Sequence, residues 1–206
     1  MRKKMIEYNQ STILHAAKEL FQTKGILGTT VDEIARTADC SKATIYVYFK
    51  NKDDIYYHIV LEYMIILRDS IHTCFANAVD YEAAYFSLCN TLVRFAEDYP
   101  MYFECILGNI SVEPDKMAEL PVLKAIFDIG EEINGIVCTF LERAKADGFV
   151  SSDIYPLQAT FVMWSGICGW ISLCSNKQSY FEKSLQMSQE DMLHSGFSMI
   201  LRSIKK

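Results

Sequence analysis

The sequence predicts an all-α protein of about nine helices, and three observations lead to this prediction. Half of the 206 residues are hydrophobic and 22% are charged, so the chain can bury a core and is not disordered. Glycine and proline together make up only 13 residues, which leaves few of the breaks that short strands and hairpins need. Apolar residues recur at helical spacing between capping signals along most of the chain.

The N-terminal region predicts three short helices and the start of a long one. Apolar residues between Ile13 and Phe21 share a helical face, and Gly25 follows as a stop. The segment Thr30–Glu33 has the pattern of a capping box, and Ser41 has the position of an N-cap for a third helix. Because only Asp39 and Cys40 remain between the second and third helices, the region predicts a helix-turn-helix.

The remainder of the chain is also predicted to be helical. A long helix begins at the cap segment Asn51–Asp54 and runs to about Ala78. Further helices are expected from about Tyr81 to Asp98, Pro100 to Ile110, Pro121 to Ala146, Pro156 to Ser175 and Gln189 to Ser203, with a loop from Asn176 to Ser188. We therefore divide the chain into a helix-turn-helix domain, residues 1–52, and a helical domain, residues 53–206.

Charge is distributed unevenly between these two parts. Residues 1–52 carry nine basic and five acidic side chains, a net charge of +4, whereas the remainder carries 11 basic and 21 acidic side chains, a net charge of −10. A basic domain beside an acidic one favours a polyanionic partner for the basic domain. Charge alone leaves open the alternative of ordinary variation in surface charge.

Residues 13–52, ILHAAKELFQTKGILGTTVDEIARTADCSKATIYVYFKNK, resemble the DNA-binding domain of tetracycline-repressor-like (TetR family) transcriptional regulators. Three ordered blocks carry the resemblance: A-x-x-L-F-x-x-x-G, T-T-V-x-x-I-A-x-x-A and S-K-x-T-x-Y-x-Y-F-x-x-K. The rest of the chain matches the family only in its helical pattern and length. The resemblance implies a cytoplasmic regulator, most often a repressor, that binds a palindromic double-stranded DNA operator as a homodimer and responds to a small molecule.

The third helix is expected to enter the major groove as the recognition helix. Its early and outward positions are expected to contact bases, and the start of the second helix and the end of the third to contact phosphates. The expected DNA-binding residues are Thr29, Thr30, Ser41, Lys42, Ala43, Thr44, Tyr46, Val47, Tyr48 and Lys52. The resemblance assigns phosphate contacts to Tyr48 and Lys52. Thr30 and Ser41 also serve as caps, Tyr46 has a core alternative, and Ile45 and Phe49 are assigned to the core.

The helical domain is expected to supply a dimer interface and an effector pocket. Apolar residues of the last two helices recur at alternating spacings of four and three, and the resemblance implies dimerisation through these helices. The expected interface residues are Leu157, Phe161, Trp164, Gly166, Cys168, Gly169, Leu193, Phe197, Ile200 and Ile204. An aromatic surplus and the resemblance together suggest a pocket for an apolar or aromatic effector, lined by Tyr63, Leu67, Tyr85, Phe86, Cys89, Tyr102, Phe103, Phe127, Met163 and Trp164. The alternative for any one of these aromatic residues is that it belongs to the hydrophobic core and does not line a pocket.

Other classes of function find little support in the sequence. The four histidines are dispersed without metal-ligand spacing, no phosphate-binding glycine loop is present, and no enzyme, metal or cofactor is predicted. Seven scattered cysteines without a CxxC pair, and an N-terminus without an apolar run, predict a reducing cytosol. The uncharged stretch Ile154–Asn176 is long enough to cross a membrane but is diluted by polar residues. Two alternatives remain: a helical binding or enzymatic protein with a vestigial helix-turn-helix, and a membrane-anchored helical protein.

Overall fold

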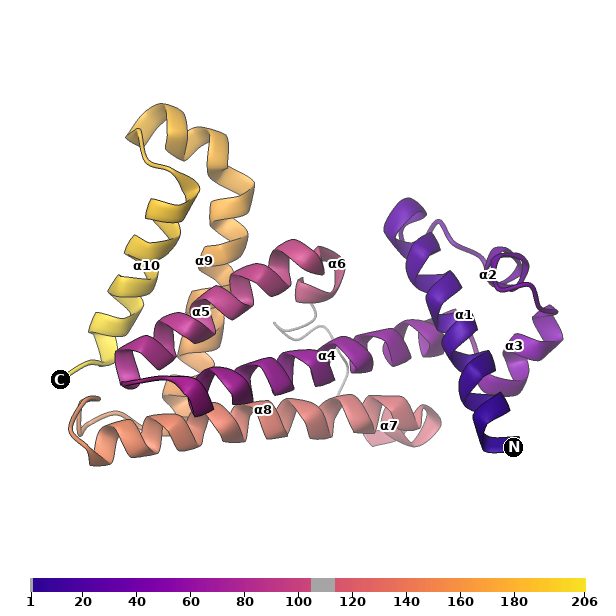
Figure 1. Ribbon diagram of the computed structural model, residues 1–206, viewed down its shortest axis with the longest axis horizontal. Coiled ribbons are helices and arrows are strands. Elements are labelled where there is room, and N and C mark those ends of the chain that lie inside the picture. The colour runs from indigo at the N-terminus through magenta and orange to yellow at the C-terminus, as the bar shows by residue number, and fades with distance from the viewer. Residues whose placement is uncertain (1, 105–113) are drawn as a thin grey trace. The chain divides into compact units, whose positions relative to one another are not determined.

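The computed structural model describes residues 2–104 and 114–206, and this part of the chain folds into ten α-helices (Figure 1). In chain order they are α1 Arg2–Lys24, α2 Val31–Thr37, α3 Lys42–Tyr48, α4 Lys52–Asn77, α5 Tyr81–Asp98, α6 Pro100–Phe103, α7 Pro114–Glu119, α8 Pro121–Ala146, α9 Pro156–Leu185 and α10 Gln189–Ile204. The all-α prediction is confirmed.

Helix boundaries follow the predicted caps closely. The helices α5 and α8 have the predicted bounds, and Gly25, at a φ of 72°, ends α1 in a left-handed conformation that glycine adopts without strain. The short helix α7 was not predicted. The helix predicted from Pro100 ends at Phe103, and the remaining residues of that prediction, 105–110, lie outside the described residues.

The prediction for the end of α9 was wrong. This helix continues ten residues past Ser175, and most of the expected loop Asn176–Ser188 is helical. The side chain of Phe181 is buried and its ring lies 6.4 Å from that of Trp170 in the same helix, so burial of an aromatic side chain stabilises a segment whose polar composition resembles a loop. Gln186, at a φ of 54°, ends the helix.

The chain divides into two compact units. Unit 1 comprises Met1–Ile65 with Ile110–Asp128, and unit 2 comprises Ile66–Asn109 with Ile129–Lys206. The helices α4 and α8 each contribute to both units. In unit 1, α1, α2, α3 and the start of α4 enclose a core of large apolar side chains. The largest of them are Ile13, Phe21, Ile34, Ile45, Phe49, Ile55 and Ile59, each at most 2% exposed.

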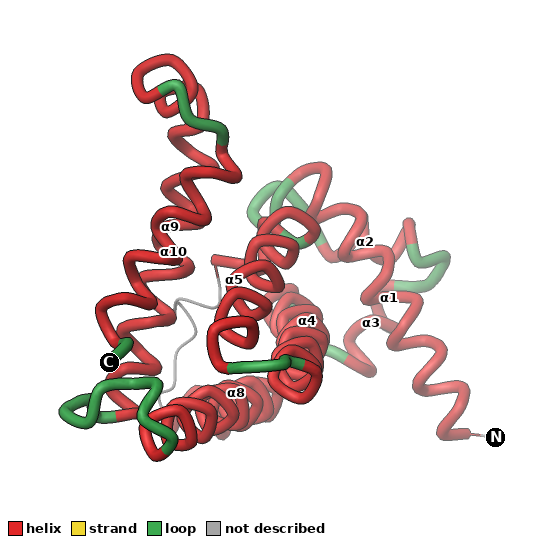
Figure 2. Tube along the Cα trace, turned by 60° about the vertical axis from the view of Figure 1, so that its left-hand side comes forward, coloured by secondary structure: helices red, strands yellow, loops and turns green. Residues whose placement is uncertain are grey.

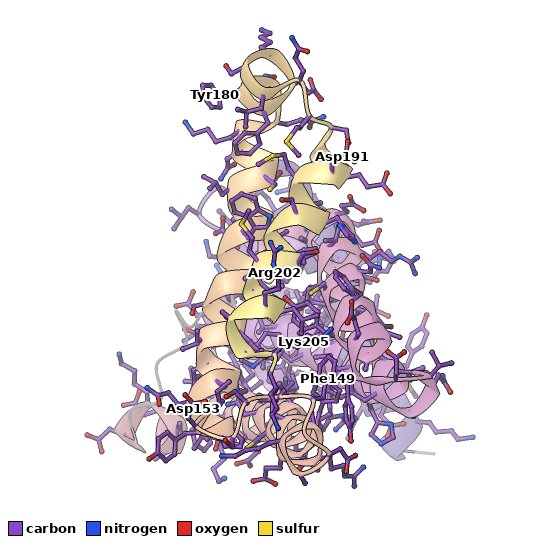
Figure 3. All side chains as sticks on the ribbon, turned by 90° about the vertical axis from the view of Figure 1, so that its left-hand side faces the viewer. Phe149, Asp153, Tyr180, Asp191, Arg202 and Lys205 are labelled. Carbon is purple, nitrogen blue, oxygen red and sulfur yellow. The ribbon has the colours of Figure 1, made fainter. Side chains whose placement is uncertain are left out.

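In unit 2, α9 and α10 form an antiparallel hairpin, and α5 packs against both (Figures 1 and 2). At the end of α10, Lys205 donates to Glu82 at 2.5 Å, and its ammonium lies 5.1 Å from the centre of the Phe149 ring. Figure 3 shows Lys205 beside Phe149 at one end of the hairpin and Tyr180 near the other. The C-terminus is thereby attached to the α8–α9 connection, which fixes one end of the hairpin.

The helix α9 is long and apolar enough to span a membrane by length and composition. Of its most apolar window, 44% is buried inside the protein. One face carries buried side chains such as Ile167, Cys168 and Ile171, while Phe161 and Val162 are more than half exposed. Composition does not separate a membrane helix from a core helix with one uncovered apolar side.

Candidate DNA-binding surface

The start of α2 is held by a reciprocal cap, which confirms the predicted capping box. The Glu33 amide donates to the Thr30 hydroxyl at 3.2 Å, and the Thr30 amide donates to the Glu33 carboxylate at 2.9 Å. The Lys24 ammonium donates to the same carboxylate at 2.5 Å. These hydrogen bonds, that of Lys24 first and those of Thr30 next, lower the pKa of Glu33 to about 2. The N-terminus of α2 is therefore fixed to the end of α1.

The turn between α2 and α3 positions Ser41, the residue that caps the N-terminus of α3. Asp39 adopts a left-handed conformation at a φ of 50°, and the Cys40 amide donates to the Ala35 carbonyl at 2.9 Å. The Thr44 amide then donates to the Ser41 hydroxyl at 3.0 Å, which confirms Ser41 as the N-cap of α3. A connection this short sets the direction of α3 relative to α2.

One face of α3 is buried and the other is exposed. Ile45 and Phe49 are 1% and 2% exposed, as expected for core residues, whereas Tyr46 and Val47 are 50% and 75% exposed. Of the other expected base contacts, Lys42 and Ala43 are exposed and Thr44 is half-buried. The outward face of the expected recognition helix therefore presents methyl groups, a phenol and an ammonium in one continuous surface.

Two residues of this helix have partners elsewhere in unit 1. The Lys42 ammonium donates to Asp32 of α2 at 2.8 Å, and this hydrogen bond raises the pKa of Lys42. The Tyr48 hydroxyl accepts a hydrogen bond from the Asn9 side chain at 2.9 Å. Sequence reasoning missed Asp32 and Asn9, because neither belongs to the third helix and their pairing depends on how the helices pack.

Thr29 and Lys52, both expected at phosphates, form hydrogen bonds to protein backbone. The Lys52 ammonium donates to the carbonyls of Ile26 and Thr29, at 2.6 and 2.8 Å. Thr29 is 1% exposed, and its hydroxyl donates to the Gly25 carbonyl at 2.8 Å. Both side chains therefore hold the loop that leads into α2, while the exposed Thr30 stands at the helix N-terminus.

A buried carboxylate joins α3 to α4. Asp54 is 6% exposed and accepts a hydrogen bond from the Lys50 amide at 2.8 Å. Its own amide donates to the Asn51 side chain at 2.8 Å, and the ring of His58 packs edge-on against Phe49 at 5.1 Å. Because these contacts surround the residues between α3 and α4, the C-terminal end of α3 is fixed in place.

The expected dimer residues divide between the surface and the interior of unit 2. Leu157 and Phe161 are 56% and 54% exposed, and Gly169 is exposed as well. Gly166 and Ile200 are half-buried, and an added Cβ at Gly166 would lie 3.4 Å from the Ile200 side chain. The other five, Trp164, Cys168, Leu193, Phe197 and Ile204, are buried inside the protomer. Three exposed apolar residues outside the expected set are Val162, Leu173 and Met199.

The expected effector residues do not all fall in one unit. Tyr63 and Phe127 belong to unit 1, and Phe127 is 39% exposed. The other eight belong to unit 2, where Leu67, Tyr85, Cys89, Tyr102, Phe103, Met163 and Trp164 are buried and Phe86 stacks on His194 with ring centres 5.1 Å apart.

Two of the buried side chains in unit 2 differ in how their polar atoms are satisfied. The Tyr85 hydroxyl donates to the Phe197 carbonyl at 2.9 Å. The indole N–H of Trp164 is buried without an acceptor in the part of the chain described. Among the described residues, no group of three or more His, Cys, Asp or Glu side chains is placed to hold a metal ion.

Comparison with known proteins agrees with this geometry. Residues 13–59 match the family model of bacterial regulatory proteins of the tetR family. The chain is 26% identical over 153 residues to the uncharacterized HTH-type transcriptional regulator YvkB of Bacillus subtilis, covering 68% of this chain and 76% of that protein. It is 33% identical over 69 residues to IcaR, the negative transcriptional regulator of the biofilm operon icaADBC in Staphylococcus epidermidis, covering 34% and 31%.

A solved structure extends the likeness of fold along the chain. The transcriptional regulator FadR of Bacillus subtilis, in complex with stearoyl-CoA, superimposes with a TM-score of 0.70 at 18% identity, covering 94% of this chain and 98% of that one. The helix-turn-helix carries the expected caps and an exposed face on α3, and residues 13–59 match the family model. Residues 13–59 form a helix-turn-helix of the TetR family of bacterial regulatory proteins.

Proposed function

We propose that this regulator is a cytoplasmic repressor that binds a palindromic operator as a homodimer and is released by a small molecule. The proposal of DNA binding rests on the exposed face of α3. The C-cap of α2 and the N-cap of α3, at the two ends of the turn between them, hold this helix in place. Repression is supported by the likeness to IcaR, which is named as a negative regulator. Half-sites read by a symmetric dimer lie about 34–36 Å apart, one turn of the duplex.

Within each half-site, the exposed side chains of α3 read bases. Lys42 donates to guanine, and the methyl groups of Ala43, Thr44 and Val47 contact thymine methyl groups. Thr30, Ser41, Tyr46 and Tyr48 supply contacts to the DNA backbone or groove edge.

Selection of bound sequences from random DNA tests this arrangement. The wild-type chain should enrich a palindrome, and Val47→Ala should change the preferred base at one position of each half-site. The exposed Leu27 lies outside α3, so Leu27→Ala serves as the matched control and should leave the preference unchanged. Identical preferences for all three proteins would contradict the placement of α3 in the groove.

We propose two alternative roles for Lys52, and the salt dependence of DNA binding distinguishes them. Affinity for DNA falls by about 0.9 log unit per neutralised phosphate for each tenfold rise in salt. If Lys52 leaves its two carbonyl partners to bind phosphate, Lys52→Met lowers the affinity for all DNA sequences alike. It then also reduces the slope of log affinity against log salt concentration by the contribution of about one phosphate contact. If it acts by holding the loop before α2, affinity falls without a change in slope. The hydrogen bonds to Ile26 and Thr29 favour the second outcome.

We propose that a second copy of the chain covers the exposed apolar face of α9 and α10. Phe161, Val162 and Leu173 form this face on α9, and Met199 adds to it from α10. An exposed patch of this kind is typical of an interaction surface, and in a symmetric dimer the same patch faces itself.

Placing a charge in this face tests dimerisation. Val162→Arg puts an unpaired charge into the contact and should give monomers with weak operator affinity, as measured by sedimentation and fluorescence anisotropy. Val79→Arg is a matched control, because Val79 is exposed and lies off this face. A Val162→Arg dimer with normal operator affinity would contradict this interface.

We propose that an effector with a long apolar part binds among the buried side chains of unit 2. Two observations support this proposal: the Trp164 indole N–H is buried without an acceptor in the described part of the chain, and FadR was solved with stearoyl-CoA. A buried, unsatisfied donor costs about 1–3 kcal/mol, which an acceptor on a ligand would offset. The acidic net charge of the domain favours effectors without a strongly anionic part.

Titration with stearoyl-CoA and with the neutral stearoyl amide tests the effector class. By linkage, an effector that releases DNA must bind more weakly, by the same factor, when operator is present. Binding of the amide that falls about five- to 150-fold with operator would support the proposal. Equal affinities with and without operator would show that the pocket does not regulate DNA binding.

A further inference from the structure

Unit 2 contains an open groove of about 940 Å³ that lies outside the expected effector pocket. It is formed by the last turns of α4, the α4–α5 connection, the start of α5 and the second half of α8; the ends of α4 and α8 lie side by side in Figures 1 and 2. We propose that this groove binds a small molecule with a flat apolar body and a single acidic group, such as an aromatic carboxylate. This site is independent of DNA binding and of the effector site proposed around Trp164.

The apolar part of the groove is an aromatic shelf built from three helices. Phe75 of α4 and Phe140 of α8 are stacked, with ring centres 4.4 Å apart and an angle of 8° between the planes. Tyr81 of α5 meets Phe140 edge-on at 5.7 Å. Flat rings pack well on such a shelf, and the groove volume lies within the range of about 300–1,000 Å³ found for small-molecule sites.

The acidic groups at the groove are already satisfied by the protein. Glu132 accepts a hydrogen bond from Arg68 at 2.9 Å, and the Asp80 carboxylate accepts one from the Ala83 amide at 2.7 Å as the N-cap of α5. Asp147, beside the groove, accepts one from the Tyr81 hydroxyl. Arg68 is in turn held between Asp69 and Glu132. Each carboxylate thus has a hydrogen-bond partner within the protein, but of these partners only Arg68 carries a positive charge, so the groups around the groove keep a net negative charge.

Arg143 is the exception among the charged residues that line the groove. It is exposed and forms no ion pair with any described residue. It lines the same groove as Tyr81 and Phe140. The hydrogen bond to Asp147 raises the pKa of the Tyr81 phenol, and the charge of Arg143 opposes this rise. A guanidinium beside an aromatic shelf suits a ligand whose carboxylate extends from one edge of a flat ring system.

Gly135 marks the most open position along the α8 wall. A Cβ added there would meet no atom within 4 Å, so a larger side chain projects into the groove without a clash inside the protein. Gly135 belongs to a regular helix and has no left-handed conformation that substitution would strain. Gly135→Leu is therefore a clean way to fill the groove.

Two fluorescent probes that share their aromatic framework test the proposal in the full-length protein. 8-Anilinonaphthalene-1-sulfonate carries one acidic group, and N-phenyl-1-naphthylamine lacks it. We expect one sulfonate probe per protomer, displaced by 2-naphthoate. Gly135→Leu should lower the affinity for both probes at least tenfold. Arg143→Gln should weaken the sulfonate about tenfold and the neutral probe less than twofold.

Matched variants separate this groove from other apolar surfaces. Arg94→Gln removes an exposed arginine outside the groove, and Asn90→Leu fills a second groove between α5 and α10. Trp164→Phe alters the expected effector pocket. None of these three should change either affinity more than twofold. Circular dichroism and thermal unfolding check that each variant is folded, and Thr139→Phe provides a second way to fill the groove.

Three results would overturn the proposal. The first is absence of saturable sulfonate binding by the wild-type protein. The second is binding unchanged by either filling variant, Gly135→Leu or Thr139→Phe. The third is an equal loss of affinity for both probes in Arg143→Gln, which would mean that the guanidinium does not recognise the acidic group. None of these results bears on operator binding, so the proposed function is tested separately.

Discussion

The contact between Gly196 and Trp170 gives the sharpest prediction about stability. A Cβ at Gly196 of α10 would lie 2.1 Å from the Trp170 Nε1 atom and 2.3 Å from its Cε2 atom, well inside the 3.4–4 Å of ordinary contact. The same indole N–H donates to the Met192 carbonyl at 3.0 Å. Gly196→Ala must therefore displace the ring and break this hydrogen bond within the α9–α10 hairpin.

The expected magnitude follows from three contributions. Overpacking of this kind costs about 1–3 kcal/mol, and loss of the hydrogen bond about 0.5–1.5 kcal/mol. Alanine is favoured over glycine inside a helix by about 1 kcal/mol, which offsets part of the cost. Gly196→Ala should therefore lower the free energy of unfolding by about 0.5–3.5 kcal/mol.

Urea unfolding at one fixed protein concentration, followed by circular dichroism, measures this difference. Gly135→Ala is the matched control, because it makes the same chemical change in a helix where the added Cβ meets nothing. It should raise stability by about 0.5–1 kcal/mol. Equal stability changes in the two variants would refute the reasoning, since the helix-propensity gain is common to both and only the clash differs.

Three further predictions concern charge and thiol chemistry. Asp32→Asn frees Lys42 from its ion pair and should tighten operator binding about 1.5- to fivefold in fluorescence anisotropy, the small effect expected for an exposed pair; unchanged or weaker binding would contradict this. The depressed pKa of Glu33, about 2, contributes stability that is present above pH 4.5 and lost as pH falls toward 2, so Glu33→Gln should flatten the fall in stability across that window. Burial raises the pKa values of Cys89 and Cys168 to about 12, so peptide mapping after treatment with a thiol reagent at pH 8 should show both unmodified in the folded protein and modified in urea.

Much of the helix-turn-helix could be predicted because its signals are local. The Thr30 cap depends on a residue three positions away, and so does the Ser41 cap, so short sequence patterns suffice to place α2 and α3. The alternation of exposed Val47 with buried Ile45 and Phe49 likewise follows from helical periodicity. Partners distant in the chain were not predictable in this way: no local pattern pairs Asn9 with Tyr48.

The sequence by itself determined the all-α class, the two caps of the helix-turn-helix and the resemblance that identified its DNA-binding domain. Only the tertiary structure decided that Lys52 holds the loop before α2, and that Cys168 and Phe197, expected at the dimer interface, are buried within the protomer. It also decided that an arginine without an ionic partner in the described chain stands beside an aromatic shelf. The physical reason is that a cap is a contact across one helical turn, whereas the side of an apolar helix that becomes core depends on elements brought against it from far along the chain.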